Sequence, residues 1–189
     1  MTEFDFSGLG GAEAEKVSRA IERRENFYGY IPSDGLDFIM RNYVRLAERG
    51  VLEAAWLDAY VHASHFEPYG LEAIRSVFDA CDRKALLSIK PLGEFSNVPG
   101  GRLTVFRGCA GPVHAMGMSW IPSLDKAIWY AAHHAEYYNL VNPAVYVATV
   151  AVADIYCRLD HYDIDLIVCP ENAWRIEVPA SEFRLDRVR

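Results

Sequence analysis

Three short segments in the C-terminal half carry charged and polar residues of types that often take part in catalysis or in binding anionic substrates. Arg107 and Gly108 end one apolar run, Ser119 ends a second, and Asp163 and Asp165 begin a third. An arginine presents a planar fork of donors that matches phosphate oxygens. A carboxylate stabilises positive charge in a transition state, and alternation along a strand puts the two acids on one face. These three segments, in this chain order, are the strongest constellation of chemistry-bearing residues in the sequence.

The order and spacing of these segments resemble the arginine–serine–glutamate class of the ADP-ribosyltransferase superfamily. That class places an arginine on its first strand, a serine-containing strand before a helix, and a glutamate at the start of a late strand. The segment 127–131, Ala-Ile-Trp-Tyr-Ala, looks like the helix of bacterial and phage members in particular. The resemblance covers residues 103–179. It implies an α+β fold with a split, mostly antiparallel β-core, and it places the protein among bacterial or phage toxin, host-takeover or defence functions.

The resemblance also implies that NAD is the substrate and that ADP-ribose is transferred to an acceptor. Cleavage of the nicotinamide–ribose bond passes through an oxocarbenium-like ribose, as in glycoside hydrolysis. The arginine clamps phosphate or ribose oxygens, the serine hydrogen-bonds near the nicotinamide ribose, and an aromatic ring packs on the nicotinamide. The acceptor, whether protein, nucleic acid or small molecule, stays open. The residues implied in catalysis are Arg107, Ser119, Asp163 and Asp165, and those implied in NAD binding are Arg107, Gly108, Ser119, Trp120 and Tyr130.

The sequence departs from the class at its catalytic glutamate, because Asp165 stands at that position. Aspartate is one methylene shorter, and a misplacement of about 1 Å costs on the order of 10²-fold in rate. Two alternatives to a transferase therefore stay open: a degenerate member that binds a nucleotide or partner without chemistry, and a hydrolase that passes ADP-ribose to water. Asp163, Glu171 and Glu177 are further candidates for the carboxylate.

Each candidate also has an ordinary structural interpretation. Trp120 and Tyr130 are of types that more often fill a core than contact a cofactor. Arg107 alone is compatible with a surface arginine, and His114, in the loop between the first two segments, with a solvated histidine. No histidine or cysteine pair has ligand spacing, so we expect no metal site.

The elements that must position these residues fall into two parts. Apolar residues recur at helical spacing through the first ninety residues, and Pro91, Gly93, Pro99, Gly100 and Gly101 then mark a boundary. We therefore expect a helical region over 1–98 and an NAD-binding core over 99–189. The helical region is a candidate to cover the cleft, dock a target or bind a neutralising partner. In the core we expect strands at 103–106, 118–120, 144–152, 164–168 and 174–178, with a helix over 123–138.

The net charge, the apolar runs and the cysteine spacing limit the classes of binding partner and the cellular compartment that we expect. The net charge of −7 opposes general binding to nucleic acid or to an anionic membrane. Apolar runs stay well below the ~20 residues of a membrane span, and the N-terminus lacks the pattern of a signal peptide. Four cysteines without framework spacing are typical of a reduced, cytoplasmic protein.

Overall fold

The computed structural model describes residues 4–32, 36–62, 68–111, 117–160 and 163–185. It divides the chain into two compact units, Met1–Ile89 and Lys90–Arg189. The division comes at the start of the segment rich in proline and glycine. Residues 90–98, which the sequence analysis assigned to the helical region, therefore belong to the second unit. His114 lies outside the described residues.

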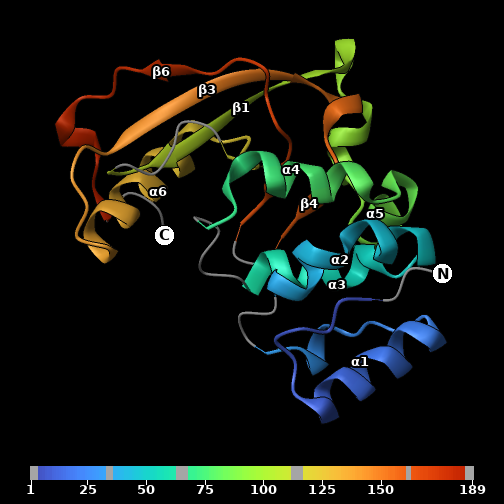
Figure 1. Ribbon diagram of the computed structural model, residues 1–189. Helices are drawn as coiled ribbons and strands as arrows, with labels where there is room; N and C mark the ends of the chain where they lie inside the picture. Colours follow the sequence, from blue (N-terminus) through green and yellow to red (C-terminus); the bar gives the residue numbers. More distant parts are fainter. Residues whose placement is uncertain (1–3, 33–35, 63–67, 112–116, 161–162, 186–189) are drawn as a thin grey trace. The chain divides into compact units, whose positions relative to one another are not determined.

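The first unit is helical, and within its described residues no strand is recorded (Figure 1). Helix α3 is its centre, because it is apolar on most sides and packs against α2, α5 and the turn η1. Trp56 on α3 is fully buried and makes edge contacts with Phe78 of α4. The elements are α1 (Gly11–Arg23), η1 (Tyr28–Tyr30), α2 (Leu36–Arg49), α3 (Leu52–His62), α4 (Gly70–Ala80) and α5 (Arg83–Ile89).

Two buried polar side chains in the first unit support its packing. Glu53 on α3 accepts a hydrogen bond of 2.8 Å from the backbone N–H of Asp82, directly before α5. Asn42 on α2 binds the N-terminal segment through the N–H and the carbonyl of Asp5, each at 2.8 Å. Because both groups are satisfied by backbone partners, we read them as structural.

Among its described residues, the second unit has two three-stranded antiparallel sheets, so the α+β class expected from the sequence is confirmed. One sheet has the order β1-β3-β6 and the other β2-β5-β4. In Figure 1, β1, β3 and β6 run side by side. The strands are β1 (Arg102–Cys109), β2 (Ser119–Trp120), β3 (Ala144–Ala151), β4 (Cys157–Leu159), β5 (Asp165–Ile167) and β6 (Trp174–Ile176). Short 3-10 turns are η2 (Gly93–Asn97), η3 (Pro99–Gly101), η4 (Val152–Asp154) and η5 (Ala180–Glu182).

Helix α6 (Leu124–Tyr137) packs on β1 and β3. Its N-cap is Ser123, whose hydroxyl accepts a hydrogen bond of 3.3 Å from Lys126 N–H. One face of α6 joins a core cluster with the sheet, and α6 lies close to β1 because the strand has Gly108 at the crossing. The buried members of this cluster are Ile121, Ala127, Ile128, Ala131 and Val145.

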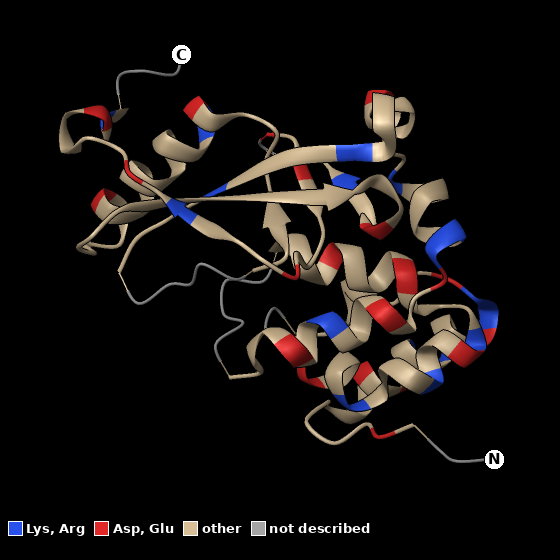
Figure 2. Ribbon diagram, turned by 90° about the horizontal axis from the view of Figure 1, so that it is seen from above, with Lys and Arg blue, Asp and Glu red and all other residues tan. Residues whose placement is uncertain are grey.

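Acidic residues outnumber basic ones in the chain, which has a net charge of −7. Acidic positions are spread over the helices of both units rather than gathered on one element (Figure 2). In the part of the chain that is described, no helix combines the length and apolarity that crossing a membrane requires.

Candidate functional site

The site lies where a single bridge joins the two sheets of the second unit. Strands β1 and β2 are joined by a bridge between Phe106 and Ile121, with N···O distances of 2.7 and 2.8 Å. Beyond the bridge, Arg107 spans the space between the strands, and its Nη1 donates to the Ser119 carbonyl oxygen at 2.9 Å. The first two sequence-predicted residues are therefore in direct contact, through the backbone of Ser119.

Gly117 lies directly against the guanidinium group of Arg107. A Cβ added at Gly117 would overlap the guanidinium carbon of Arg107 and lie 2.8 Å from its Nη1. The carbonyl of Gly117 also accepts a hydrogen bond of 2.6 Å from Trp120 Nε1. Because only a residue without a side chain leaves this space open, Gly117 holds the position of the Arg107 guanidinium.

Ser119 and Asp165 occupy diagonal positions on neighbouring strands. Ser119 pairs with Ile167, and Asp165 lies two residues before Ile167 on β5. Alternate residues of a strand share one face, and such diagonal neighbours are about 7–8 Å apart. The strand register thus places the serine and the acid on the same side of the β2-β5-β4 sheet.

Asp165 is a half-buried acid with a perturbed protonation equilibrium. Burial raises the pKa of its carboxyl from the ordinary value of 3.8 to about 6. The positive charge of Arg107 acts against this rise, and the negative charge of Asp163 adds to it. Arg107 therefore contacts the serine strand directly and acts on Asp165 through its charge.

Asp163 is turned toward helix α6 rather than left free. Lys126 Nζ lies 2.9 Å from its Oδ2, and Ile164 N–H donates to its Oδ1 at 3.1 Å. An acid that already has a lysine partner contributes less charge to a neighbouring substrate. The ion pair makes Asp163 a support that ties the start of β5 to the first turn of α6.

One face of α6 borders the acids and the arginine. Lys126, Tyr130 and His134 follow one another at intervals of four residues, which is one helical turn. Burial, followed by the charges of Asp165 and Asp163, raises the pKa of Tyr130 to about 12. Burial, followed by the charge of Arg107, lowers the pKa of His134. At neutral pH this face therefore presents a neutral phenol and a neutral imidazole.

Two residues assigned to NAD binding have structural roles. Trp120 has 0% of its surface exposed, so its ring is part of the core and cannot stack on a ligand. Gly108 is buried against α6, where an added Cβ would overlap the Ala127 carbonyl oxygen and lie 2.7 Å from Ala131 N. Both residues therefore belong to the packed core next to Arg107, and neither is placed to contact a ligand.

The remaining acidic candidates stand apart from this arrangement. Glu171 and Glu177 are both exposed, on either side of β6. Over the described ranges, no group of three or more His, Cys, Asp or Glu side chains is placed to hold a metal ion. Asp165 is therefore the acid that burial and strand register connect to Arg107 and Ser119.

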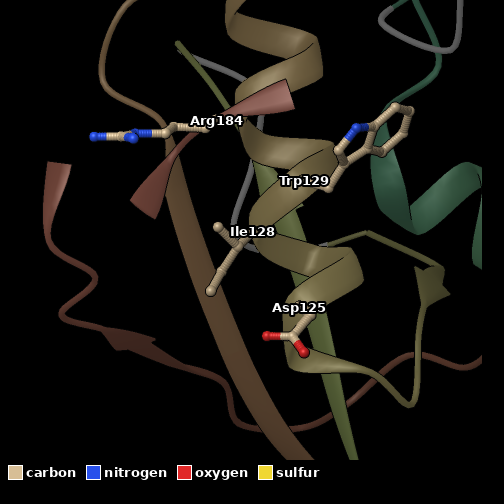
Figure 3. A pocket seen from close by; sticks show the side chains of 4 residues that line it. All are labelled: Asp125, Ile128, Trp129 and Arg184. Atoms are coloured by element: carbon tan, nitrogen blue, oxygen red, sulfur yellow. The ribbon is translucent and has the colours of Figure 1, made fainter. Parts of the chain in front are cut away.

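A separate pocket of about 340 Å³ lies on another face of α6 (Figure 3). Asp125, Ile128 and Trp129 line it from the helix, and Arg184 lines it from the C-terminal segment. Trp129 Nε1 donates to the Leu185 carbonyl at 3.2 Å, which attaches that segment to the helix. None of the sequence-predicted site residues lines this pocket, so the pocket and the Arg107 site are different places.

The sequence analysis did not predict Gly117, Lys126 or His134 as parts of the site. The four-residue spacing of Lys126, Tyr130 and His134 was visible, but spacing alone does not say what a helix face opposes. Gly117 begins the Gly-x-Ser-Trp segment that carries the resemblance, but nothing in the sequence assigned it a role, because its role depends on where the Arg107 side chain ends.

Comparisons with models of known protein families, with curated proteins and with solved structures give no match to this chain.

Proposed function

We propose that the protein binds NAD at the Arg107 site and cleaves its nicotinamide–ribose bond, passing ADP-ribose to an acceptor. The observation that carries the proposal is the contact of Arg107 Nη1 with the Ser119 carbonyl, 2.9 Å, beside the half-buried Asp165. An arginine, a serine strand and a late acidic strand are the three parts that the family resemblance requires. Their convergence at a split between two antiparallel sheets supports the proposal.

Each residue has a defined task in this reaction. Arg107 has a guanidinium held by Gly117 and Ser119, so this planar cation is pre-oriented, and its task is to bind phosphate oxygens. Asp165, when ionised, stabilises the positive charge that develops on the ribose. The glycosidic C–N bond breaks, its electron pair leaves with nicotinamide, and the acceptor's lone pair forms the new bond to the ribose carbon. The acceptor then loses its proton to solvent.

The electrostatics of the site set a condition on catalysis. The pKa of Asp165 is raised to about 6, so the carboxylate is predominantly ionised only above that pH. A bound anionic substrate lies near the same acid and favours its protonated form further. We therefore place the working range of the enzyme at neutral to mildly alkaline pH.

The test uses NAD labelled in the nicotinamide ring. The purified protein should release labelled nicotinamide, and Arg107→Ala should weaken NAD binding by about 1.5–3 kcal/mol, the range for hydrogen bonds to charged groups. Arg102→Ala is the matched control, since Arg102 is an exposed arginine on the same strand. An unchanged dissociation constant for Arg107→Ala would remove this residue from the site.

A second candidate function, a nucleotide-binding module without chemistry, is favoured by one observation. The acid is an aspartate, shorter than the glutamate of the class, and burial disfavours its charge. NAD binding without nicotinamide release, with Arg107→Ala still weakening the binding, would support the module. Nicotinamide release with ADP-ribose recovered free in solution would identify the hydrolase.

A further inference from the structure

An exposed aromatic patch lies at the C-terminal end of helix α6. Its members are Tyr137, Tyr138 and Val141, with 72%, 61% and 69% of their surfaces exposed. The rings of Tyr137 and Tyr138 lie 4.9 Å apart, edge to face. Large hydrophobic residues that are exposed singly are ordinary, but three of them within five residues form a patch that typically marks an interaction site.

Stacked rings along α6 hold the two tyrosines in place. Trp129, His133 and Tyr137 follow one another at intervals of four residues, with ring centroids 4.8 and 5.6 Å apart and planes within 5° and 28° of parallel. Tyr138 packs against His134 in the same way, with centroids 6.0 Å apart. Because these rings are already ordered, a partner that contacts them loses less side-chain entropy on binding. One face of the Tyr137 ring lies on His133, and its high exposure leaves the opposite face open to solvent.

The segment that carries the patch has negative charge and no cation of its own. In the sequence, no lysine or arginine occurs between Lys126 and Arg158. Glu136 is exposed directly before the two tyrosines, and the carbonyl groups at the C-terminus of α6 add negative potential there. Arg107, whose charge reaches this half of α6, donates to the Ser119 carbonyl on β2. The electrostatics of the patch therefore favour a cationic partner.

The chemistry of the patch selects among classes of partner. The faces of aromatic rings attract Lys and Arg cations, and a carboxylate beside the rings adds to that attraction. The same carboxylate repels phosphates, which opposes a nucleic acid or an anionic membrane. We propose that the patch binds a protein partner through a lysine- or arginine-bearing segment. The cation lies over the open face of Tyr137 and near Glu136, and its aliphatic stem packs on Tyr138 and Val141.

This inference goes beyond the proposed function and does not depend on it. None of the residues assigned to NAD binding or catalysis belongs to the patch. The binding can therefore be measured without NAD, and nicotinamide release can be measured without the partner.

The test measures binding of the full chain to fluorescently labelled octa-lysine and octa-arginine peptides by anisotropy. Tyr137→Leu should weaken binding by about two- to fivefold, and the double variant Tyr137→Leu with Tyr138→Leu by about tenfold, because leucine keeps apolar bulk but has no aromatic face. Tyr137→Phe keeps the face and should bind as wild type does. Tyr30→Leu is the control, since Tyr30 is an exposed tyrosine of the first unit. These variants all keep the net charge of −7, so unspecific attraction to the peptides stays the same.

A second pair of variants tests the carboxylate. Glu136→Gln should weaken peptide binding by about twofold or more, the effect of removing an exposed ion pair. Glu171→Gln makes the same charge change at an exposed position on another element and should leave the affinity unchanged. An equal loss in both variants would show that the peptides respond to net charge alone, and it would overturn the patch as their binding site.

The remaining outcomes are equally decisive. A wild-type protein that binds neither peptide, or equal affinities of wild type and the double tyrosine variant, overturns the inference. Self-association of wild type in sedimentation experiments that the double variant abolishes, without peptide binding, assigns the patch to a second copy of the chain and overturns it as well. Peptide binding that depends on the tyrosines, in a protein that releases no nicotinamide, supports the patch and overturns only the enzyme.

Discussion

The guanidinium of Arg107 lies directly against the α-carbon of Gly117, so that no β-carbon fits between them. Arg107 is the long, flexible partner in this contact and Gly117 the fixed one. The position of the proposed clamp therefore depends on a residue that has no side chain and no chemistry of its own.

Substitution of Gly117 by alanine should move the clamp without unfolding the protein. The new methyl group displaces the end of a flexible side chain, which costs little stability, but it turns the guanidinium away from the phosphates. We expect Gly117→Ala to weaken NAD binding by about 1–3 kcal/mol, as removal of a charged hydrogen bond does. In an Arg107→Ala background the same change should have little further effect, which a double-mutant cycle by calorimetry measures.

Gly108→Ala should instead destabilise the fold. Its β-carbon would overlap backbone atoms of α6, and backbone cannot move aside as a side chain can. We expect a loss of at least about 2 kcal/mol in the free energy of unfolding, measured by urea denaturation. Gly29→Ala is the control, because nothing lies within 4 Å of a β-carbon there. Equal stability of Gly108→Ala and wild type would show that α6 does not approach β1 as described.

Asp165→Asn should make the protein more stable at neutral pH. Well below pH 3.8, the ordinary pKa of the group, the acid is protonated in both the folded and the unfolded state and contributes no difference. As the pH rises toward 6, the unfolded chain ionises first, because burial holds the folded pKa at about 6. Wild type therefore loses stability over this window, by about 1–3 kcal/mol relative to Asp165→Asn at pH 7. Denaturation curves at pH 4 and pH 7 measure the difference, with the exposed Asp154→Asn as control.

The same acid should control turnover. Asp165→Asn removes the charge that stabilises the oxocarbenium, so its effect should fall on the turnover number and leave NAD affinity unchanged. Asp165→Glu restores the reach of the class and should keep or raise the rate. The wild-type rate should increase with pH through about 6, as the carboxylate ionises. If Asp165→Asn releases nicotinamide at the wild-type rate, Asp163, Glu171 and Glu177 become the acids to test.

Much of the fold could be predicted from local patterns. The helix now seen at Leu124–Tyr137 and the central strand Ala144–Ala151 are long and strongly periodic, so their type and place followed from the sequence. Strand β4 (Cys157–Leu159) was not predicted, because three residues carry too little alternation to stand out. Its pairing with β5 is a tertiary interaction that no local pattern encodes.

The site was predictable only in part, because contacts between segments distant in the sequence decide what each residue does. Residue type and order pointed to Arg107, Ser119 and Asp165, but the first contact runs through a backbone carbonyl, which every residue has. Trp120 shows the same limit: the sequence offered it both as a core residue and as a ligand contact, and its complete burial favours the core. Burial and approach distances decide these roles, and both arise from packing between distant segments.

The most direct measurement of the central claim is a crystal structure of the protein with NAD bound. The account predicts that the diphosphate contacts Arg107 and that the nicotinamide ribose is the part of the ligand nearest to Asp165. NAD bound in the pocket of Asp125, Ile128, Trp129 and Arg184, or crystals that contain no NAD at saturating concentrations, would contradict it.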